Sequence, residues 1–236
     1  MKTSMRYLAV IFAVALLAVS LLVVSADSFT DVTGQTAHYK AIDTLTSYGI
    51  IHGYEDNTFR PDLPVKRSEM AKLVYVTATT SVDAGEGVVT FPDVAQNNWA
   101  KGYISWCAAK SIVGGYEDGT FKPEESVTYD EALKMLCAML GYTDFKSDLW
   151  PTDVRIKALI DLNLGEALDG VAGDAVLTRG QVAQLFANSL DEQMYIEPVE
   201  TKHGKPILPN DKPLTLGGDP RLCGEGVGYL CRRSQL

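Results

Sequence analysis

The sequence predicts an all-α protein with three helix-loop-helix repeats packed as a pseudo-threefold bundle, an N-terminal signal peptide and an irregular C-terminal tail. The first observation behind this prediction is an internal repeat. The stretch "GYEDNTFRP" begins at Gly53 and "GYEDGTFKP" begins at Gly115, 62 residues later, with seven of nine positions identical. The second observation is that apolar residues recur at helical spacing on both sides of each copy. Because repetition at a fixed period is the signature of repeat architectures, each copy should mark one structural unit.

The first 26 residues have the pattern of a secretory signal peptide. Lys2 and Arg6 precede a largely apolar run over residues 8–24, and small residues precede Asp27. A basic start, an apolar middle and small residues at the cleavage site are typical of a segment that is removed on export. An uncleaved membrane anchor is the alternative, because the run is close to the shortest length that spans a bilayer.

The chain is acidic, with a formal net charge of -9 at pH 7. Removal of residues 1–26 takes away two basic and no acidic residues, which changes the net charge to -11. Such a surface does not attract nucleic acids or anionic lipids, so no nucleic-acid partner is expected. Any acidic ligand has to be held by a local basic pocket.

Four cysteines are too few for a disulfide scaffold in a chain of 236 residues. Cys107 and Cys137 fall among apolar residues of expected helices, which favours small buried thiols. Cys223 and Cys231 lie in a glycine-rich stretch and are able to form a disulfide, although nothing in the sequence requires one.

The first repeat is predicted over residues 27–80 and the second over 91–142, with residues 81–90 as the linker between them. Each repeat should contain a first helix, a polar turn and a second helix that begins after the proline of the repeated stretch. The apolar positions at helical spacing are Ile42, Leu45, Tyr48 and Ile50; Ile104, Ala108 and Ile112; Met70, Leu73 and Val74; and Leu133, Leu136 and Met139.

The polar turn of each repeat should follow a glycine that ends the first helix. These helix ends are predicted at Gly49 in the first copy and at Gly114 with Gly115 in the second. The tips of the turns are Asp56-Asn57 and Asp118-Gly119. Their acidic residues are contiguous, whereas a calcium loop needs oxygen ligands at alternating positions, so we predict a structural turn and no metal site.

A third, divergent repeat is predicted over residues 143–190. It has "PTDVRIKALIDLNLG" from Pro151 and "VLTRGQVAQLFANSL" from Val176, but it lacks the repeated turn. Because a two-helix unit cannot bury its apolar face alone, the three units should pack on one another. Residues 191–236 are rich in proline and glycine and are predicted to form a linker or a poorly ordered end.

These motifs together resemble the S-layer homology module. The resemblance rests on "FTDV" and "FPDV", on Trp99-Ala100, on the two glycine-tyrosine turns, and on a second helix opened by a T-R-A-E-like sequence, and it covers residues 29–190. It implies a three-pronged spindle around a central helical bundle that anchors proteins non-covalently at the cell surface. The implied partner is secondary cell-wall polysaccharide with pyruvylated sugars, or modified peptidoglycan in some lineages, bound in grooves between neighbouring modules.

An arginine at the start of the second helix is the functional centre that the resemblance implies. A guanidinium suits the carboxylate of a pyruvyl ketal, and a helix N-terminus favours an anion. Arg67 and Arg179 occupy this position in the first and third units, and Tyr129 replaces the arginine in the second. We therefore expect at most two competent grooves. Without the resemblance, both arginines would be interpreted as exposed helix residues.

Five further residues are candidate ligand contacts. Asp31 and Asp93 can accept hydrogen bonds from sugar hydroxyls, although they fit loop or helix-cap positions equally well. Trp99 offers a flat face to a sugar ring. Gly53 and Gly115 open the turns that shape the groove walls. Ala37 takes the position of Trp99 in the first copy, with Tyr39 as a possible substitute, and this weakens the expected first groove; Trp150 is assigned to packing.

The second helices also carry capping signals. Thr128 with Glu131, and Thr178 with Gln181, fit the capping box, whereas Lys66 breaks the box in the first unit. Glu69 and Glu131 are therefore expected to act as caps and not as catalytic acids.

The sequence predicts a binding protein without cofactors and without enzymatic activity. His38, His52 and His203 lack metal-ligand spacing, and neither a "GxSxG" elbow nor a phosphate-binding loop is present. The first hypothesis is a carbohydrate-binding surface anchor that is secreted and associated with the cell wall or S-layer. The alternatives are a structural protein that assembles with other surface-layer proteins, and a truncated anchor fragment of a larger surface enzyme.

Overall fold

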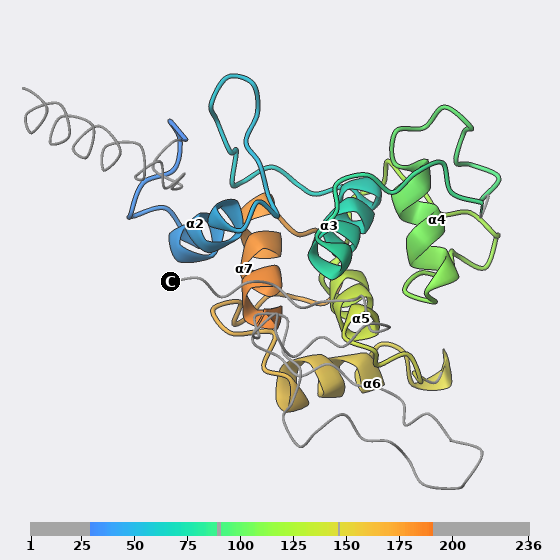
Figure 1. Ribbon diagram of the computed structural model, residues 1–236. Coiled ribbons are helices and arrows are strands. Elements are labelled where there is room, and N and C mark those ends of the chain that lie inside the picture. The colour runs from blue at the N-terminus through green and yellow to red at the C-terminus, as the bar shows by residue number, and fades with distance from the viewer. Residues whose placement is uncertain (1–28, 89–90, 146, 191–236) are drawn as a thin grey trace, which may run out of the picture.

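The computed structural model describes residues 29–88, 91–145 and 147–190, so the expected signal peptide, the tail, Cys223 and Cys231 lie outside the described residues (Figure 1). Within these ranges the regular elements are helical, which confirms the all-α class, and β pairing is limited to isolated bridges. No helix in these ranges is long and apolar enough to cross a membrane. The helices are α2 (Tyr39–Ser47), α3 (Arg67–Thr79), α4 (Lys101–Ala109), α5 (Tyr129–Met139), η2 (Ser147–Leu149), α6 (Thr152–Arg155), η3 (Ile156–Asp161) and α7 (Arg179–Ser189).

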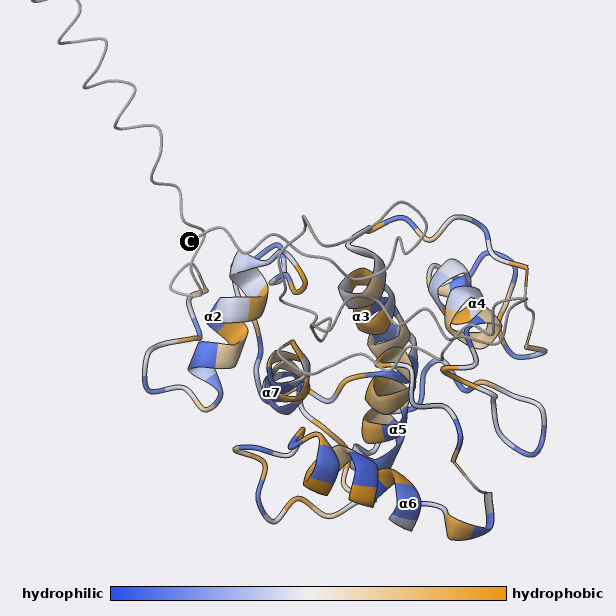
Figure 2. Ribbon diagram, turned by 60° about the horizontal axis from the view of Figure 1, so that its bottom comes forward, coloured by the Kyte–Doolittle hydropathy of each residue, from blue (hydrophilic) through white to orange (hydrophobic). Residues whose placement is uncertain are grey.

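The helices form an inner and an outer group. Figure 2 shows α3, α5 and α7 in the middle, with α2, α4 and α6 around them. The outer helix of each unit packs on the inner helix of another unit: α2 contacts α7, α4 contacts α3, and α6 contacts α5. Each unit therefore buries its apolar faces against its neighbours, as expected of two-helix repeats.

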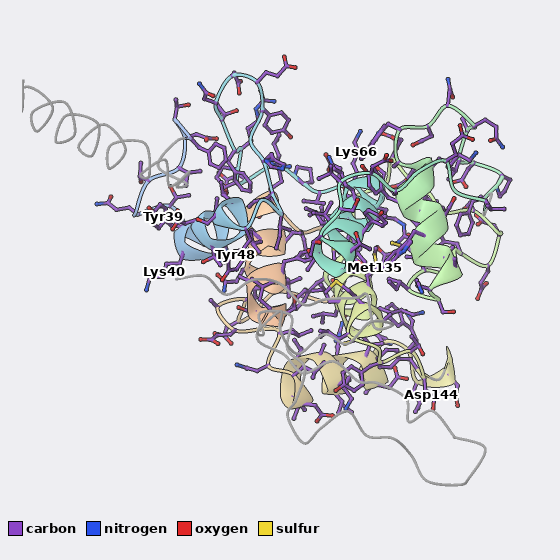
Figure 3. The ribbon with its side chains drawn as sticks, in the orientation of Figure 1. Tyr39, Lys40, Tyr48, Lys66, Met135 and Asp144 are labelled. Carbon is purple, nitrogen blue, oxygen red and sulfur yellow. The ribbon has the colours of Figure 1, made fainter. Side chains whose placement is uncertain are left out.

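A single cluster of buried side chains joins the three units. Its fully buried large members are Phe59, Phe121, Phe186, Ile42, Leu45, Met70, Ile104, Leu133, Leu136, Leu140, Leu164 and Leu177. Figure 3 shows the difference between core and surface side chains: Met135 on α5 lies inside, whereas Lys40 extends outward from α2. Cys107 and Cys137 are buried free thiols, as predicted, and burial raises the pKa of each to about 12.

The segments before the three inner helices are joined by a cycle of backbone hydrogen bonds. The amide of Val65 donates to the carbonyl of Leu177 (3.0 Å), Leu177 donates to Val127 (3.1 Å), and Val127 donates to Val65 (2.9 Å). The first amides of each inner helix, which lack partners within a helix, also donate to carbonyls of another unit. These bonds, of 2.8–3.1 Å, run from Arg67 and Ser68 to Glu125 and Pro123, from Tyr129 and Asp130 to Ala175 and Gly173, and from Arg179 and Gly180 to Leu63 and Pro61.

The end of the first helix differs between the two copies. Gly49 follows α2 with a φ of 66°, as predicted. In the second copy α4 ends at Ala109, and Ser111, with a φ of 58°, occupies the position equivalent to Gly49. The prediction of a stop at Gly114 was therefore wrong. The chain places a serine in the left-handed region, which non-glycine residues adopt rarely, so glycine spacing alone misjudged the boundary.

The outer helix of the third unit is irregular. The short α6 continues into η3, a π-helical stretch over Ile156–Asp161. Val154 and Leu162 are buried, but Ile160 is 74% exposed and Ile156 is 50% exposed. Trp150 is also 41% exposed, and its ring lies 4.9 Å from the Lys134 ammonium, so its assignment to packing holds only in part.

The capping boxes predicted for α5 and α7 are present. In α7 the Thr178 hydroxyl accepts a hydrogen bond from the Gln181 amide, and the Gln181 side chain accepts one from the Thr178 amide. At α3 only Glu69 makes its half of the box, because Lys66 has no side-chain acceptor.

Thr178→Ala is expected to lower the free energy of unfolding by about 1 kcal/mol, because the Gln181 amide loses its cap. Urea denaturation followed by circular dichroism measures the change. Lys66→Ala is the matched control, since it removes no cap and only an exposed ion pair with Glu124, which contributes little. Equal destabilisation by the two variants would show that the Thr178 cap is unimportant.

Candidate functional site

The two repeated turns are held by the same side-chain contacts. Asp56 accepts hydrogen bonds from the amide and hydroxyl of Thr58, and Asp118 accepts both bonds from Thr120. The hydrogen bonds from Thr58 and Arg60 lower the pKa of Asp56 to about 2. These contacts confirm the interpretation of the repeated stretch as a structural turn.

The two candidate aspartates fix the return of each turn to the core. The Asp31 carboxylate accepts the amides of Phe59 and Arg60 (both 2.7 Å). Asp93 accepts the corresponding amides of Phe121 (2.9 Å) and Lys122 (2.6 Å). Each carboxylate therefore has a structural task, and its contact with a sugar stays a prediction.

The two candidate glycines are required by close packing. A Cβ on Gly53 would lie 2.3 Å from the Phe29 ring and 2.8 Å from the Thr58 carbonyl oxygen. On Gly115 a Cβ would lie 2.8 Å from the Phe91 ring, and the backbone has a φ of 75°. Both glycines thus allow an aromatic ring to approach the start of the turn.

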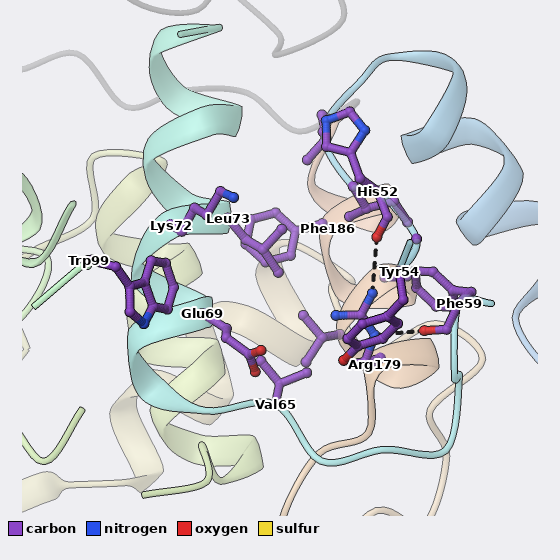
Figure 4. Close-up of a pocket in the computed structure, with 15 residues that line it drawn as sticks. His52, Tyr54, Phe59, Val65, Glu69, Lys72, Leu73, Trp99, Arg179 and Phe186 are labelled. Carbon is purple, nitrogen blue, oxygen red and sulfur yellow. Dashed lines mark hydrogen bonds between the residues drawn. The ribbon is translucent and has the colours of Figure 1, made fainter. Parts of the chain in front are cut away.

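Arg179, at the start of α7, reaches across to the turn of the first unit. Its Nε donates to the Phe59 carbonyl (2.8 Å) and its terminal nitrogen to the His52 carbonyl (3.1 Å), as Figure 4 shows. The guanidinium also lies 5.0 Å from the centroid of the Tyr54 ring and 4.5 Å from that of Phe59. Within the described residues no carboxylate lies within 4 Å of Arg179, so its positive charge is available to an anion.

A hollow of about 230 Å³ lies beside Arg179, between α3, α7 and the first turn. Gly53, Tyr54 and Phe59 line it from the turn, and the side chains that α3 contributes include Lys72 and Glu69 (Figure 4). Trp99, which is 56% exposed, lines the hollow from the second unit. The hollow therefore combines two cations, a carboxylate and an exposed aromatic face.

Arg67 occupies the equivalent position at the next junction, but it is buried and paired. Its Nε donates to the Phe121 carbonyl (2.9 Å), and its terminal nitrogen forms an ion pair with Glu131 (3.1 Å). The Arg67 residue is 6% exposed, and its guanidinium lies 4.6 Å from the centroid of the Tyr116 ring. The charge of Arg67 is therefore neutralised within the fold.

The third junction has no arginine at this position, because Tyr129 takes its place and is 4% exposed. The neighbouring Asp130 forms a two-point ion pair with Arg155, with nitrogen–oxygen distances of 2.6 and 2.7 Å. This pair joins the second and third units, and its charges are mutually satisfied.

Comparison with known proteins now identifies two segments. Residues 28–71 and 90–133 each match the S-layer homology domain. These two segments are similar to the S-layer homology domain. They are separated by the same 62-residue offset as the repeated turns, and the third unit lies outside both matches.

Several relatives of the chain are named for the cell surface or the cell wall. It is 29% identical over 217 residues to a "Cell surface protein" of Thermoanaerobacter kivui, covering 88% of this chain and 27% of the relative. It is 28% identical over 155 residues to the "Middle cell wall protein" of Brevibacillus brevis, with 64% and 14% covered. A "Cellulosome-anchoring protein" of Acetivibrio thermocellus is 30% identical over 122 residues, with 47% and 27% covered. The chain thus spans about a quarter or less of the length of these relatives. The two domain matches and these relatives indicate a surface protein associated with the cell wall or S-layer.

The structure brings together only some of the predicted site residues. Arg179, Trp99 and Gly53 line one hollow, while Arg67 lies at the next junction. Trp99, from the second unit, lines the hollow at the first turn. Ala37 lines a different hollow, beside Asp31, and the expectation that it weakens the first groove stays a prediction.

The sequence reasoning missed Tyr54, Lys72 and Glu69 as groove residues. Tyr54 belongs to the repeated stretch, and that repetition was the available signal. Its ring centroid lies 5.0 Å from the guanidinium of Arg179 and 4.1 Å from that of Arg60. Lys72 and Glu69 lie on α3, and their place in the hollow depends on how α3 and α7 pack. No pattern in the sequence marks that arrangement.

The Arg67–Glu131 pair is expected to make stability depend on pH. Burial opposes ionisation of Glu131, but hydrogen bonds from Thr128 and Tyr116 and the charge of Arg67 outweigh it and lower its pKa. A carboxyl whose folded-state pKa is lowered stabilises the fold above its unfolded pKa of about 4.3, and this stabilisation is lost as the pH falls through the folded-state value.

Urea denaturation at about pH 7, 5 and 3 checks this expectation, and the free energy of unfolding should fall below about pH 4. Glu131→Gln removes the titrating group, so its free energy of unfolding should fall less steeply with acid than that of the parent. Parallel curves for the two proteins would exclude Glu131 as a contributor.

Proposed function

We propose that this chain is a non-covalent cell-surface anchor that binds an anionic cell-wall polysaccharide in the groove at Arg179, without catalysis. The observation that carries the proposal is the guanidinium of Arg179, which is held by two carbonyls and a tyrosine ring and has no carboxylate partner in the described residues. A secondary cell-wall polysaccharide with pyruvylated sugars offers the matching carboxylate. Modified peptidoglycan is the alternative ligand.

The chemistry of the groove suits an acidic sugar. A guanidinium binds a carboxylate through charge-assisted hydrogen bonds, and Lys72 adds a second positive charge. The exposed face of Trp99 suits the C–H surface of a sugar ring. Because the whole chain is acidic, the local charge of Arg179 and Lys72 has to overcome a repulsive background.

We propose further that residues 143–190 are a third, divergent module and that the three units are related by a pseudo-threefold axis. The cycle of hydrogen bonds through Val65, Val127 and Leu177 supports this arrangement. The packing of each outer helix on the inner helix of another unit supports it as well.

Co-sedimentation of the purified chain with cell-wall sacculi tests the anchor. Sacculi that keep their secondary polysaccharide should retain the chain, and sacculi from which mild acid has removed the polymer and its ketals should not. Retention by both preparations would point to peptidoglycan as the ligand. Absence of retention by either would refute the anchor.

A second candidate is a structural protein that pairs with other chains of a surface layer. The exposed side chains of Ile156 and Ile160 on η3 favour it, because contiguous apolar surface often marks a protein contact. Sedimentation equilibrium of the parent and of Ile160→Lys distinguishes this candidate, since self-association through η3 should be lost in the variant.

A further inference from the structure

We propose that Glu131 closes the junction at Arg67 by holding the position that a ligand carboxylate takes at Arg179. The chain would then have one open anion-binding groove. A junction would be closed where the glutamate in the first turn of the adjacent inner helix pairs with the arginine, and open where it does not. This inference rests on the proposed function of the Arg179 groove and concerns how many such grooves can be occupied.

The two arginines have equivalent surroundings. Arg179 donates from Nε to the carbonyl of Phe59 (2.8 Å), and Arg67 donates from Nε to the carbonyl of Phe121 (2.9 Å). Each guanidinium also lies over the tyrosine of the repeated turn, at 5.0 Å from the Tyr54 centroid and 4.6 Å from the Tyr116 centroid. The two arginines thus share one backbone hydrogen bond and one tyrosine contact, and Arg179 also donates to the His52 carbonyl (3.1 Å).

The two glutamates behave differently. One oxygen of Glu131 accepts the Thr128 amide, and the other binds both Arg67 (3.1 Å) and the Tyr116 hydroxyl (2.6 Å). Glu69 is its counterpart in the first unit and also accepts the amide of its cap residue, Lys66.

Among the described residues, however, Glu69 is not within ion-pair distance of Arg179, and the hollow lies between them (Figure 4). The junction at Arg179 is therefore open, whereas the junction at Arg67 already contains the carboxylate of Glu131.

A ligand cannot use Arg67 without displacing Glu131. The displaced carboxylate would lose its ion pair and the Tyr116 hydrogen bond while 19% exposed, which is unfavourable for a charged group. A ligand at Arg179 has no such competitor among the described residues. The intramolecular carboxylate is also held at high effective concentration by the helix that carries it.

Glu131→Gln separates the pairing from the capping function. The amide has one oxygen, which can accept the Thr128 amide as Gln181 accepts the Thr178 amide (3.0 Å) in α7. The remaining NH₂ group cannot accept from Arg67. The variant should therefore keep the helix cap and release the arginine. Glu124→Gln is the matched control, because it makes the same charge change at an exposed carboxylate that pairs with Lys66 and lies outside the hollow.

Isothermal titration of the full chain with a pyruvylated methyl glycoside tests the inference. We expect one site in the parent, two in Glu131→Gln, none in Arg179→Ala, and one in the double variant Arg179→Ala/Glu131→Gln. Adding Arg67→Ala to the double variant should abolish that site. Glu124→Gln should keep one site. Circular dichroism at the titration temperature verifies that each variant is folded.

The outcomes distinguish this inference from the proposed function. Two sites in the parent, or one site in Glu131→Gln with none in the double variant, would overturn the role of Glu131 and leave the Arg179 groove intact. Binding by Glu131→Gln alone would support the role of Glu131 and refute binding at Arg179. Absence of binding by all variants would overturn both. If Glu131→Gln fails to fold, two sites in the parent would still refute the inference, and a single site lost with Arg179→Ala would support it.

Discussion

Arg179→Ala is expected to abolish retention of the chain by native sacculi and to lower its affinity for an acidic sugar about 100-fold. Loss of a desolvated charge partner costs about 2–5 kcal/mol of binding free energy, and about 2.7 kcal/mol corresponds to a 100-fold change. The effect on folding should be smaller, because Arg179 forms no ion pair within the described residues and leaves no carboxylate behind. Sedimentation binding curves and urea denaturation of the same preparation measure the two effects.

Arg60→Ala provides the matched control for this prediction. Arg60 also lies over the Tyr54 ring, at 4.1 Å from its centroid, but it forms an exposed ion pair with Asp56. Its removal changes the net charge by the same amount as Arg179→Ala. If Arg60→Ala weakened binding as much as Arg179→Ala, general electrostatics and not the groove would account for retention.

Gly53→Ala is expected to destabilise the protein by about 1–3 kcal/mol, as overpacking of a filled site generally does. The new methyl group would stand 2.3 Å from the Phe29 ring, which itself packs on Phe59 with ring centroids 5.5 Å apart. The Phe29 ring would have to move to relieve this clash, and its movement would disturb the turn that contains Tyr54. Urea denaturation and the near-ultraviolet circular dichroism of the aromatic residues would report both changes.

The control for Gly53→Ala is Gly34→Ala. A Cβ on Gly34 meets nothing within 4 Å, and its backbone is outside the left-handed region, so the substitution should be neutral or slightly stabilising. A similar loss of stability in both variants would mean that general loop entropy and not the contact with Phe29 explains the requirement for glycine.

Much of the fold could be predicted because the same sequence pattern occurs twice in the chain. Two copies of one turn established the unit, and helical spacing on either side established the helices. The caps at Thr128 and Thr178 were also predictable, because capping depends on residues only three positions apart. The left-handed Ser111 and the π-helical stretch at Ile156–Asp161 were not predictable, since tertiary packing overrides local preference there.

The candidate site was predictable only in part. The sequence identified Arg67 and Arg179 as equivalent, and their local surroundings are indeed alike. It did not distinguish the paired arginine from the unpaired one, because that difference depends on the glutamate of a separate unit. Asp31 and Asp93 illustrate the same limit: a carboxylate that fits a ligand also fits a pair of backbone amides 28 residues away.

The cycle of hydrogen bonds through Val65, Val127 and Leu177 distinguishes this architecture from an open stack of repeats. In an open stack a terminal unit can be deleted or an extra one added, because each unit depends only on its immediate neighbours. A closed ring has no terminal unit, so loss of any one unit breaks two interfaces at once. It exposes the first amides of one remaining inner helix and, on the other remaining unit, the carbonyls that accepted from the lost helix. We therefore expect the other two units to require residues 143–190, even though this segment lacks the repeated turn.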